Sequence, residues 1–300
     1  MMIQTSAQIL DLRRDTACIA DVEASMAAQF KQNGGVPGLL GSDASRAAAY
    51  HLASGGQRVR AQLALDAAFK LDMPAQDAIA LAACVELLHN ASLIHDDLQD
   101  RSRSRRDRAA VWHLYGDSVA VCAGDLLISA AYRALSTFSG THLLPDLFAL
   151  THNCIAQSIK GQCADLSASS QFASDIDRYV AVAMAKSGAL LSLPLELVLA
   201  STGFGQAVPV ACKAARAFAV GYQIADDMAD IEEDVADINA HPSPNILLVL
   251  QSAGYGVGTF AAARSMGLAH LVEAASTAET LPSGAGEFLR TLALRLAARL

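Results

Sequence analysis

Charged and aromatic residues are both scarce in this 300-residue chain, at 17% and 5% of its positions. Hydrophobic residues make up 53%, so the chain can bury a sizeable core and intrinsic disorder is excluded. The formal net charge of -8 argues against a nucleic-acid partner, because nucleic-acid phosphates bind to basic surfaces. The composition therefore predicts a globular protein that does not bind nucleic acid.

The sequence also lacks closely spaced cysteine pairs and any obvious membrane segment. Its six cysteines show no CxxC spacing: Cys18, Cys84, Cys122, Cys154, Cys163 and Cys212. With mostly apolar neighbours, they are expected to be reduced core residues of a cytoplasmic protein rather than a zinc site or a disulfide framework. The first residues do not resemble a signal peptide, and the longest uncharged run, residues 242–263, contains two prolines and three glycines. We therefore expect no membrane anchor.

Alternating strand patterns are absent, whereas helical periodicity is present almost throughout. Alanine is abundant, which favours helices packed closely through small side chains. Glycine- and proline-rich breaks separate segments of helical length; they lie at 33–38, 54–57, 138–142, 202–209, 241–244, 254–258 and 281–286. The sequence predicts a single all-α domain over residues 1–300, with ten or more helices.

One acidic motif, D-D-x-x-D, occurs twice. LIHDDLQD (93–100) and YQIADDMAD (222–230) each end an apolar helical run with this spacing. On a helix, the first and last carboxylates of such a motif lie on one face, about one turn apart. Carboxylates this close repel one another unless a cation intervenes, and Mg²⁺ with phosphate and water as its other ligands suits them best. The alternative is that the aspartates are ordinary surface acids at solvated helix ends. The presence of a second copy of the motif argues against this alternative.

A basic cluster, RSRSRRDR (101–108), directly follows the first motif. Guanidinium groups bind phosphate oxygens in a forked geometry, so Arg105 and Arg106 are candidate phosphate ligands. Arg101, Arg103 and Arg108 are equally compatible with a solvated loop that balances the acids. Two acidic clusters facing one cavity would hold a diphosphate between them.

These segments resemble the trans-isoprenyl diphosphate synthases, also called polyprenyl synthetases, from about residue 50 to about residue 250. The family pattern G-G-K-R-x-R appears as GGQRVR (55–60), and a histidine seven residues before the first aspartate appears as His89. GQCADL (161–166) is similar to G-Q-x-x-D-L, and KSGALL (186–191) to K-T-x-x-L. The predicted helix that contains A-G-D (123–125) is also similar to the family pattern, and the order and spacing of all these motifs agree with that pattern.

The resemblance implies an isoprenoid synthase fold, a helical bundle around a central active-site cavity, and a role for each matching residue. The implied metal ligands are Asp96, Asp97, Asp100, Asp226, Asp227 and Asp230. They would bind about three Mg²⁺ ions per site, with Mn²⁺ as a possible substitute. The implied ligands of the allylic diphosphate are Arg105, Lys186, Ser187 and Gln223. The implied ligands of isopentenyl diphosphate are Gln57, Arg58 or Arg60, His89 and Arg106. The implied catalytic residues are Lys186, Asp96, Asp97, Asp100, Asp226 and Asp227.

Several of these residues have a structural alternative. His89 lies on an apolar segment, where a lone histidine often packs without further function. Gln223 is able to bond a neighbouring helix, and Gln162 and Asp165 are able to cap or cross-link helices. Lys186 follows the apolar run AVAMA. Because a lysine is unfavourable in an apolar core, its position favours a role as a phosphate ligand.

The chain departs from the family pattern at several positions. Gln57 stands where the family usually has lysine, and Asp107 replaces the glycine that usually follows the arginine pair. No lysine occurs after Lys213, where the family usually supplies two. Each lost charge-assisted hydrogen bond weakens diphosphate binding by about 1–3 kcal/mol. The metal-binding aspartates are all retained.

The implied reaction joins isopentenyl diphosphate to an allylic diphosphate (dimethylallyl, geranyl or farnesyl), with a homodimer as the family expectation. Ala91 and Ser92, the fifth and fourth residues before Asp96, are small, and Leu88 lies next on that face. The resemblance implies that the product grows along a channel beside the helix that ends at the first motif. Because no aromatic side chain blocks this channel, we expect a product of twenty carbons or more, with geranylgeranyl diphosphate as the first candidate. Two alternatives remain: a non-catalytic subunit of a heteromeric synthase, which the missing lysines favour, and a terpene cyclase.

Overall fold

The structure of the protein is a computed structural model that describes residues 17–29, 43–167, 174–229 and 245–300. Asp230 lies outside the described residues. The chain divides into two compact units, residues 1–145 and 146–300, and each is described by itself. The prediction of one domain over the whole chain is not tested by this division and stays a prediction.

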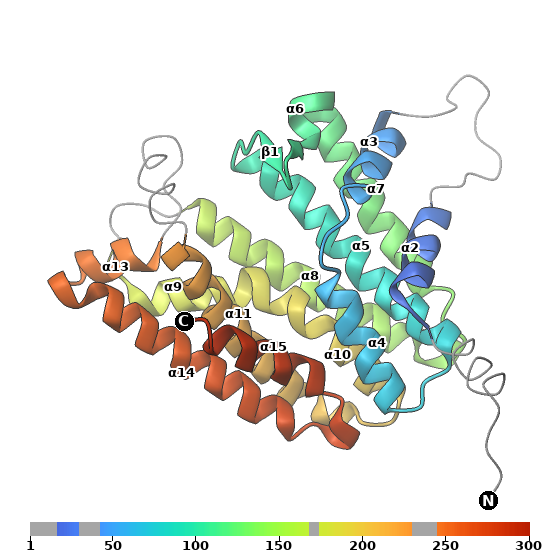
Figure 1. The fold of residues 1–300 in the computed structure, drawn as a ribbon. Helices are drawn as coiled ribbons and strands as arrows, with labels where there is room; N and C mark the ends of the chain where they lie inside the picture. Colours follow the sequence, from blue (N-terminus) through green and yellow to red (C-terminus); the bar gives the residue numbers. More distant parts are fainter. Residues whose placement is uncertain (1–16, 30–42, 168–173, 230–244) are drawn as a thin grey trace, which may run out of the picture. The chain divides into compact units, whose positions relative to one another are not determined.

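The predicted all-α class is confirmed (Figure 1). The helices of the first unit are α2 Ile19–Ala28, α3 Asp43–Leu52, α4 Val59–Lys70, α5 Ala75–Gln99, α6 Val111–Tyr115, α7 Asp117–Leu135 and the short η1 Thr141–Leu143. The only strands among the described residues form a two-stranded antiparallel hairpin, β1 Ser104–Arg105 and β2 Arg108–Ala109. This hairpin carries the basic cluster that follows the first acidic motif.

The second unit is helical throughout its described residues. Its elements are α8 Leu144–Leu166, α9 Ile176–Ala183, the π-helical segment η3 Met184–Gly188, α10 Ala189–Ser201, η4 Gly205–Ala207, α11 Val208–Ala229, α13 Ile246–Ser252, η5 Gly256–Gly258, α14 Thr259–Glu279, η6 Pro282–Gly284 and α15 Glu287–Ala297. Helix α8 begins two residues before the boundary of the unit. Helices α9, η3 and α10 follow one another without a break in the chain.

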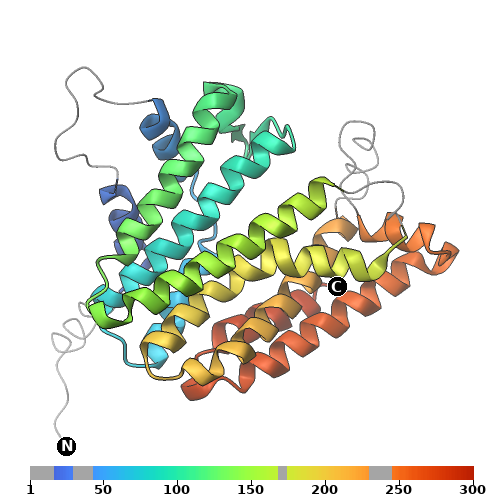
Figure 2. The same cartoon turned by 180° about the vertical axis from the view of Figure 1, so that it is seen from behind.

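The core of the first unit is built around α5 and α7, which run side by side in both views (Figure 1, Figure 2). Small residues allow this approach. A methyl group placed on Gly124 of α7 would collide with the imidazole of His95 on α5. At the other end of the pair, the backbone N–H and the hydroxyl of Ser139 both donate to the carboxylate of Asp77, each at 2.7 Å. These contacts fix the register of α5, and with it the position of the acidic motif at its C-terminus.

Helices α10, α11 and α14 form the centre of the second unit. Helix α10 is buried on nearly every side, which explains its almost continuous apolar sequence. Gly221 allows α11 to lie close to α14, because a side chain at position 221 would collide with the side chain of Leu271 on α14. The two long helices, α11 in gold and α14 in orange-red, lie along each other in Figure 1. The C-terminal end of α11 carries the second acidic motif.

Three segments of the described chain are long and apolar enough, by length and composition alone, to cross a membrane: Ala75–Gln99, Asp117–Leu135 and Ile176–Ser201. The most apolar stretches of the first and third are 72% buried inside the structure, and that of the second is 44% buried. Burial in a protein core accounts for the apolar character of the first and third. The expectation that the chain has no membrane anchor stays a prediction.

All six cysteines are free thiols in the structure, and their reduced state stays a prediction. The prediction that they are core residues is correct for Cys84 and Cys154 and wrong for Cys18, Cys122 and Cys163, which are exposed. Apolar sequence neighbours are a poor guide on a helix, because adjacent residues point about 100° apart and only every third or fourth shares a face.

Candidate functional site

The first acidic motif ends α5, with Asp100 as the C-cap residue. Asp96 is half-buried and Asp100 is exposed, and their spacing confirms the expected one-turn separation on the helix. Carboxylates are unfavourable here, because the C-terminus of a helix already carries a partial negative charge. The last turn of α5 contains no basic residue to offset them. The end of this helix is therefore suited to bind a cation.

Asp97 differs from its two neighbours because only 1% of its surface is exposed. Its Oδ1 accepts a hydrogen bond from Nε of Arg105 at 2.7 Å, and Nη2 of the same guanidinium forms an ion pair with it at 2.7 Å. Its Oδ2 is buried and accepts no hydrogen bond from the described residues. Burial raises the pKa of Asp97, although Arg105 acts in the opposite direction. An oxygen of this kind is suited to a metal ion or to an ordered water molecule.

The basic hairpin turns through Arg106 and Asp107, whose φ angles are +53° and +59°. Two positive φ angles in a two-residue loop define a type I′ turn, where glycine, asparagine and aspartate are favoured. Asp107 therefore replaces the family glycine without loss of the turn. The neighbouring arginines have structural contacts. Arg101 forms an ion pair with Asp117 at 2.8 Å, and Arg108 lies over the ring of Tyr50 at 4.1 Å.

The glycine pair at 55–56 meets this hairpin. Both glycines have positive φ angles, +72° and +126°. The guanidinium of Arg106 lies against them: it donates to the carbonyl oxygen of Gly55, and a methyl group on Gly56 would come within 2.6 Å of its Cζ. Ser54 accepts a further hydrogen bond from Arg106 at 3.3 Å. The G-G turn and Arg106, far apart in the sequence, thus form one surface, as the resemblance implies.

Arg58 and Arg60, the two candidate ligands, have different environments. Arg58 is 6% exposed; it donates to Glu23 and to the carbonyl of Leu52, each at 3.0 Å, and lies 3.5 Å from a carboxylate oxygen of Glu86. It therefore ties α2, α3 and α5 together. Arg60 lies close to His89, and its charge is the strongest electrostatic influence on that imidazole.

His89 and His51 show that this region is strongly positive. Burial lowers the pKa of His89 well below its usual value, and the charges of Arg60, Arg106 and Arg105 lower it further. His51 of α3, 4% exposed, has a pKa lowered to about 4 by burial and then by Arg106 and Arg105. Both imidazoles are therefore neutral near pH 7. Three arginines, Arg60, Arg105 and Arg106, close to two neutral histidines are suited to bind an anion.

Sequence reasoning missed His51. No motif marks it, because it becomes part of this cluster only when α3 packs beside α5 and the hairpin. Gln57 is exposed at the edge of the cluster, and its backbone carbonyl accepts a hydrogen bond from Gln62 at 2.5 Å.

The second acidic motif lies at the C-terminal end of α11. Asp226 is exposed, whereas Asp227 is 5% exposed and has hydrogen bonds to both carboxylate oxygens. Gln223 donates to its Oδ1 at 2.7 Å, and the Tyr179 hydroxyl and the backbone N–H of Ile246 donate to its Oδ2, each at 2.7 Å. The two neighbouring aspartates of this motif thus have different environments. Tyr179 was not singled out by the sequence, which gives no sign of this contact.

Lys186 lies in the π-helical segment η3, a type of helix that recurs at functional sites. Its ammonium group forms an ion pair with Asp165 at 2.6 Å, and its carbonyl oxygen accepts from the Ser158 hydroxyl at 2.8 Å. Gly161 of α8 touches the backbone of residues 185 and 186, where a side chain would not fit. The motif G-Q-x-x-D-L therefore supports Lys186: its glycine permits the approach and its aspartate holds the side chain. Ser187, next along η3, is half-buried.

The residues expected to set the product length lie on α5 as predicted. Ala91 is 1% and Leu88 is 3% exposed, and Ser92 is half-buried with its hydroxyl donating to the carbonyl of His89 at 2.8 Å. Cys84 continues the same face and is fully buried. This face is lined by small and medium side chains.

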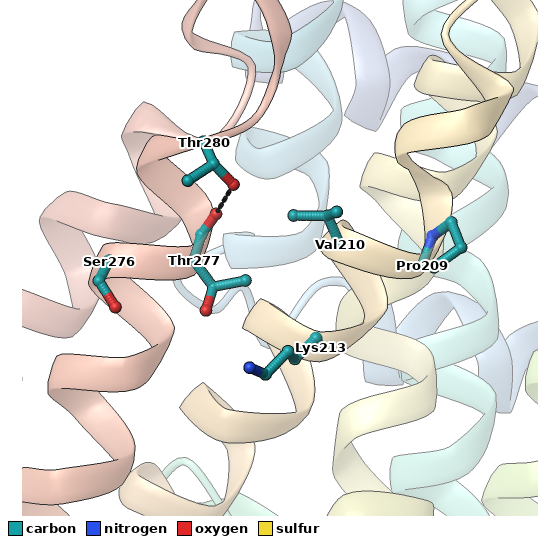
Figure 3. Close-up of a pocket in the computed structure, with 6 residues that line it drawn as sticks. All are labelled: Pro209, Val210, Lys213, Ser276, Thr277 and Thr280. Carbon is teal, nitrogen blue, oxygen red and sulfur yellow. Dashed lines mark hydrogen bonds between the residues drawn. The ribbon is translucent and has the colours of Figure 1, made fainter.

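A shallow cavity of about 480 Å³ lies elsewhere, between the start of α11 and the end of α14 (Figure 3). Pro209, Val210 and Lys213 line one side, and Ser276, Thr277 and Thr280 line the other. Lys213 is paired with Glu273 at 3.0 Å. None of the predicted site residues lines this cavity, so it is not the candidate site.

Within the described residues, no group of three or more His, Cys, Asp or Glu side chains is arranged to hold a metal ion by itself. The first unit carries the acidic end of α5 and the arginine cluster, and the second carries Asp226 and Lys186. That the two parts face one cavity stays a prediction.

The family model for polyprenyl synthetase matches residues 43–241. The (2E,6E)-farnesyl diphosphate synthase of Mycobacterium tuberculosis is 34% identical over 177 residues, which cover 59% of this chain and 49% of that one. The geranylgeranyl pyrophosphate synthase of Geoglobus acetivorans is 29% identical over 189 residues, covering 62% and 59%. The chain thus spans about half the length of the curated relatives it matches.

The same fold is found among solved structures. The geranylgeranyl pyrophosphate synthetase structure from the archaeon Geoglobus acetivorans superposes with a TM-score of 0.80 at 22% identity, and covers 92% of this chain and 96% of that one. The family match includes both the GGQRVR turn and the two acidic motifs. On this evidence, the chain belongs to the polyprenyl synthetase family.

Proposed function

We propose that this protein is a Mg²⁺-dependent trans-prenyltransferase that joins isopentenyl diphosphate to an allylic diphosphate. One observation carries the proposal: the acidic end of α5 lies directly beside a cluster of arginines around two neutral histidines. A cation site next to an anion site is what the transfer of a metal-bound diphosphate requires.

The residues present fit Mg²⁺. Asp96 and Asp100 offer accessible carboxylates, and Oδ2 of Asp97 is a buried acceptor that the described residues leave unbonded. In the second unit, Asp226 offers an exposed carboxylate. Few protein ligands suit Mg²⁺, which usually completes its shell with water and substrate phosphates. When bound, Mg²⁺ neutralises the charge that develops on a diphosphate leaving group.

The chain's own cations would complete the allylic site. Arg105 is oriented by Asp97, and Lys186 by Asp165, so each is positioned before substrate arrives. Such positioned charges stabilise a leaving diphosphate without reorganisation during the reaction. Ser187 and Gln223 remain candidate ligands of the same diphosphate, although Gln223 donates to Asp227 in this structure.

Isopentenyl diphosphate would bind the second cluster, formed by Gln57, Arg60, His89 and Arg106. Arg106 lies on the Gly55–Gly56 turn, where the absence of a side chain at position 56 leaves room for its guanidinium. The double bond of isopentenyl diphosphate would attack the allylic carbocation, and loss of a proton would complete the product. The apolar face of α5 would shield the carbocation and the growing chain from water.

The product is proposed to have twenty carbons or more, with geranylgeranyl diphosphate first. Support comes from the small side chains at Ala91 and Ser92 and from the moderate size of Leu88. We also infer a cytoplasmic homodimer, for which the family membership and the free thiols are the support.

The test is a turnover assay of the purified full chain, without any partner protein. The protein is incubated with Mg²⁺, labelled isopentenyl diphosphate and either dimethylallyl or farnesyl diphosphate, and the products are sized by chromatography. The expected result is chain elongation to C20 or longer, lost in Asp96→Asn and retained in Asp72→Asn, a control at an exposed aspartate of the same unit. Absence of turnover would favour a non-catalytic subunit, and a C15 product would refute the proposed length.

A further inference from the structure

We propose that Tyr179 is a positioning residue, which acts through Asp227 to fix the second acidic motif relative to the segment that carries Lys186. In this inference Asp227 is a structural link rather than a metal ligand, and Asp226 is the carboxylate that the link presents. The inference rests on the proposed function, because it assigns parts of the same diphosphate site.

The hydrogen bonds of Asp227 provide the first argument. Its two carboxylate oxygens accept from three groups on three different elements: the hydroxyl of Tyr179 on α9, the amide of Gln223 on α11, and the N–H of Ile246 at the start of α13. All three distances are 2.7 Å. Asn245 adds a fourth contact by donating to the carbonyl oxygen of Asp227 at 2.8 Å. Oδ2 already accepts two of these bonds, so a metal ion would have to displace one of them there, and at Oδ1 it would have to share the oxygen with Gln223.

The position of Tyr179 in the chain provides the second argument. Helix α9 runs directly into η3, so Lys186 lies seven residues after Tyr179 on a continuous helical segment. Asp226 precedes Asp227 on α11 and is exposed. The bond between Tyr179 and Asp227 therefore joins the helix of the phosphate-binding lysine to the helix of the metal-binding carboxylate.

The surroundings make this link rigid. Tyr179 is buried in a cluster that includes Val220, Ile224, Ile246 and Leu250. Within this apolar cluster the Tyr179 hydroxyl donates to Oδ2 of Asp227 at 2.7 Å. At the other end, Asp165 holds Lys186 at 2.6 Å. The distance between Lys186 and Asp226 is thus set by side chains that do not themselves touch substrate.

The test compares Tyr179→Phe with Tyr255→Phe in the full chain. Both variants remove one phenolic hydroxyl from the second unit, but Tyr255 is 49% exposed and lies in the turn between α13 and α14. Mn²⁺ binding is measured by electron paramagnetic resonance in the presence of inorganic pyrophosphate, without turnover, and melting temperatures are measured alongside. Groups that orient metal ligands typically change metal affinity by about 10-fold or more when removed.

The expected result is Mn²⁺ affinity about 10-fold weaker in Tyr179→Phe and unchanged in Tyr255→Phe. The Mg²⁺ concentration needed for half-maximal rate rises in parallel, and excess Mg²⁺ restores most of the rate. A lower melting temperature with unchanged Mn²⁺ affinity would overturn the inference, because Tyr179 would then have a structural role only. If the wild-type chain binds Mn²⁺ and pyrophosphate in a Tyr179-dependent way but shows no turnover, the positioning role stands and the proposed function fails.

A double-mutant cycle with Asp227→Asn tests the route of the effect. If Tyr179 acts through Asp227, the two substitutions together weaken Mn²⁺ binding about as much as one alone. If Asp227 is itself a metal ligand, its substitution has a larger effect and the two losses add, which would overturn the assignment. Should Tyr179→Phe not fold, Asn245→Ser replaces it, because it removes a different bond to residue 227 and retains a helix-capping side chain. The same loss of Mn²⁺ affinity, smaller in size, is expected there, and unchanged affinity would overturn the inference.

Discussion

Gly161→Ala is the substitution whose outcome the structure predicts most directly. Gly161 of α8 contacts the backbone of residues 185 and 186, and a methyl group there would lie 2.7 Å from the carbonyl carbon of Ala185 and from Cα of Lys186. Because these are backbone atoms, they cannot rotate away as a side chain can. Either α8 or η3 has to move.

The size of the effect follows from two opposing contributions. Overpacking of this kind costs about 1–3 kcal/mol, whereas alanine is favoured over glycine in a helix by about 1 kcal/mol. We expect a net loss of up to about 2 kcal/mol, which corresponds to a fall in melting temperature of up to about 8 °C for a unit of this size. The displacement also moves Lys186, and misplacement of a catalytic group by a fraction of an ångström lowers kcat by about 3- to 10-fold.

Thermal melting and steady-state turnover of the full chain are the assays. Gly258→Ala is the matched control, because a methyl group at position 258 would meet no atom within 4 Å and the φ angle there is negative. The control should melt and turn over as the wild-type chain does. If Gly161→Ala is as stable as the control and retains full kcat, then the close contact does not position Lys186 and the reasoning is wrong.

Three further predictions concern the first unit. As the pH is lowered below 6.5, His51 becomes protonated in the unfolded chain, whereas in the folded chain it stays neutral down to about pH 4. The free energy of unfolding therefore decreases by up to about 3 kcal/mol as the pH falls through this window. In urea unfolding, His51→Gln should flatten this part of the stability profile, and the exposed control His142→Gln should not. Gly56→Ala, which would place a methyl group 2.6 Å from the guanidinium of Arg106, should raise the KM for isopentenyl diphosphate about 10-fold and leave that for the allylic substrate nearly unchanged. Ser92→Phe should shorten the main product toward C15, as sized by chromatography; an unchanged product would mean that the chain does not grow along this face of α5.

The sequence alone predicted the helical class, the breaks between helices that fall on described residues, and the placement of both acidic motifs at helix ends; the predicted breaks at 33–38 and 241–244 lie outside the described residues. These features depend on short-range chemistry: the period of apolar residues, the backbone demands of glycine and proline, and the spacing of carboxylates along a helix. The resemblance to the polyprenyl synthetases, carried by GGQRVR, the arginine pair and KSGALL, implied site roles for Arg105, Arg106 and Lys186.

The tertiary structure decided which of these groups contact one another. Arg58 and Arg60 are equivalent candidates in the sequence, yet one is buried against Glu23 and Glu86 and the other lies beside His89. The aspartates of each motif are likewise interchangeable in the sequence, whereas Asp227 alone is bonded to Tyr179. Such differences come from side chains that are distant in the sequence and meet only through packing. Local patterns therefore specify which groups are available, and packing specifies the environment, burial and charge that give each group its role.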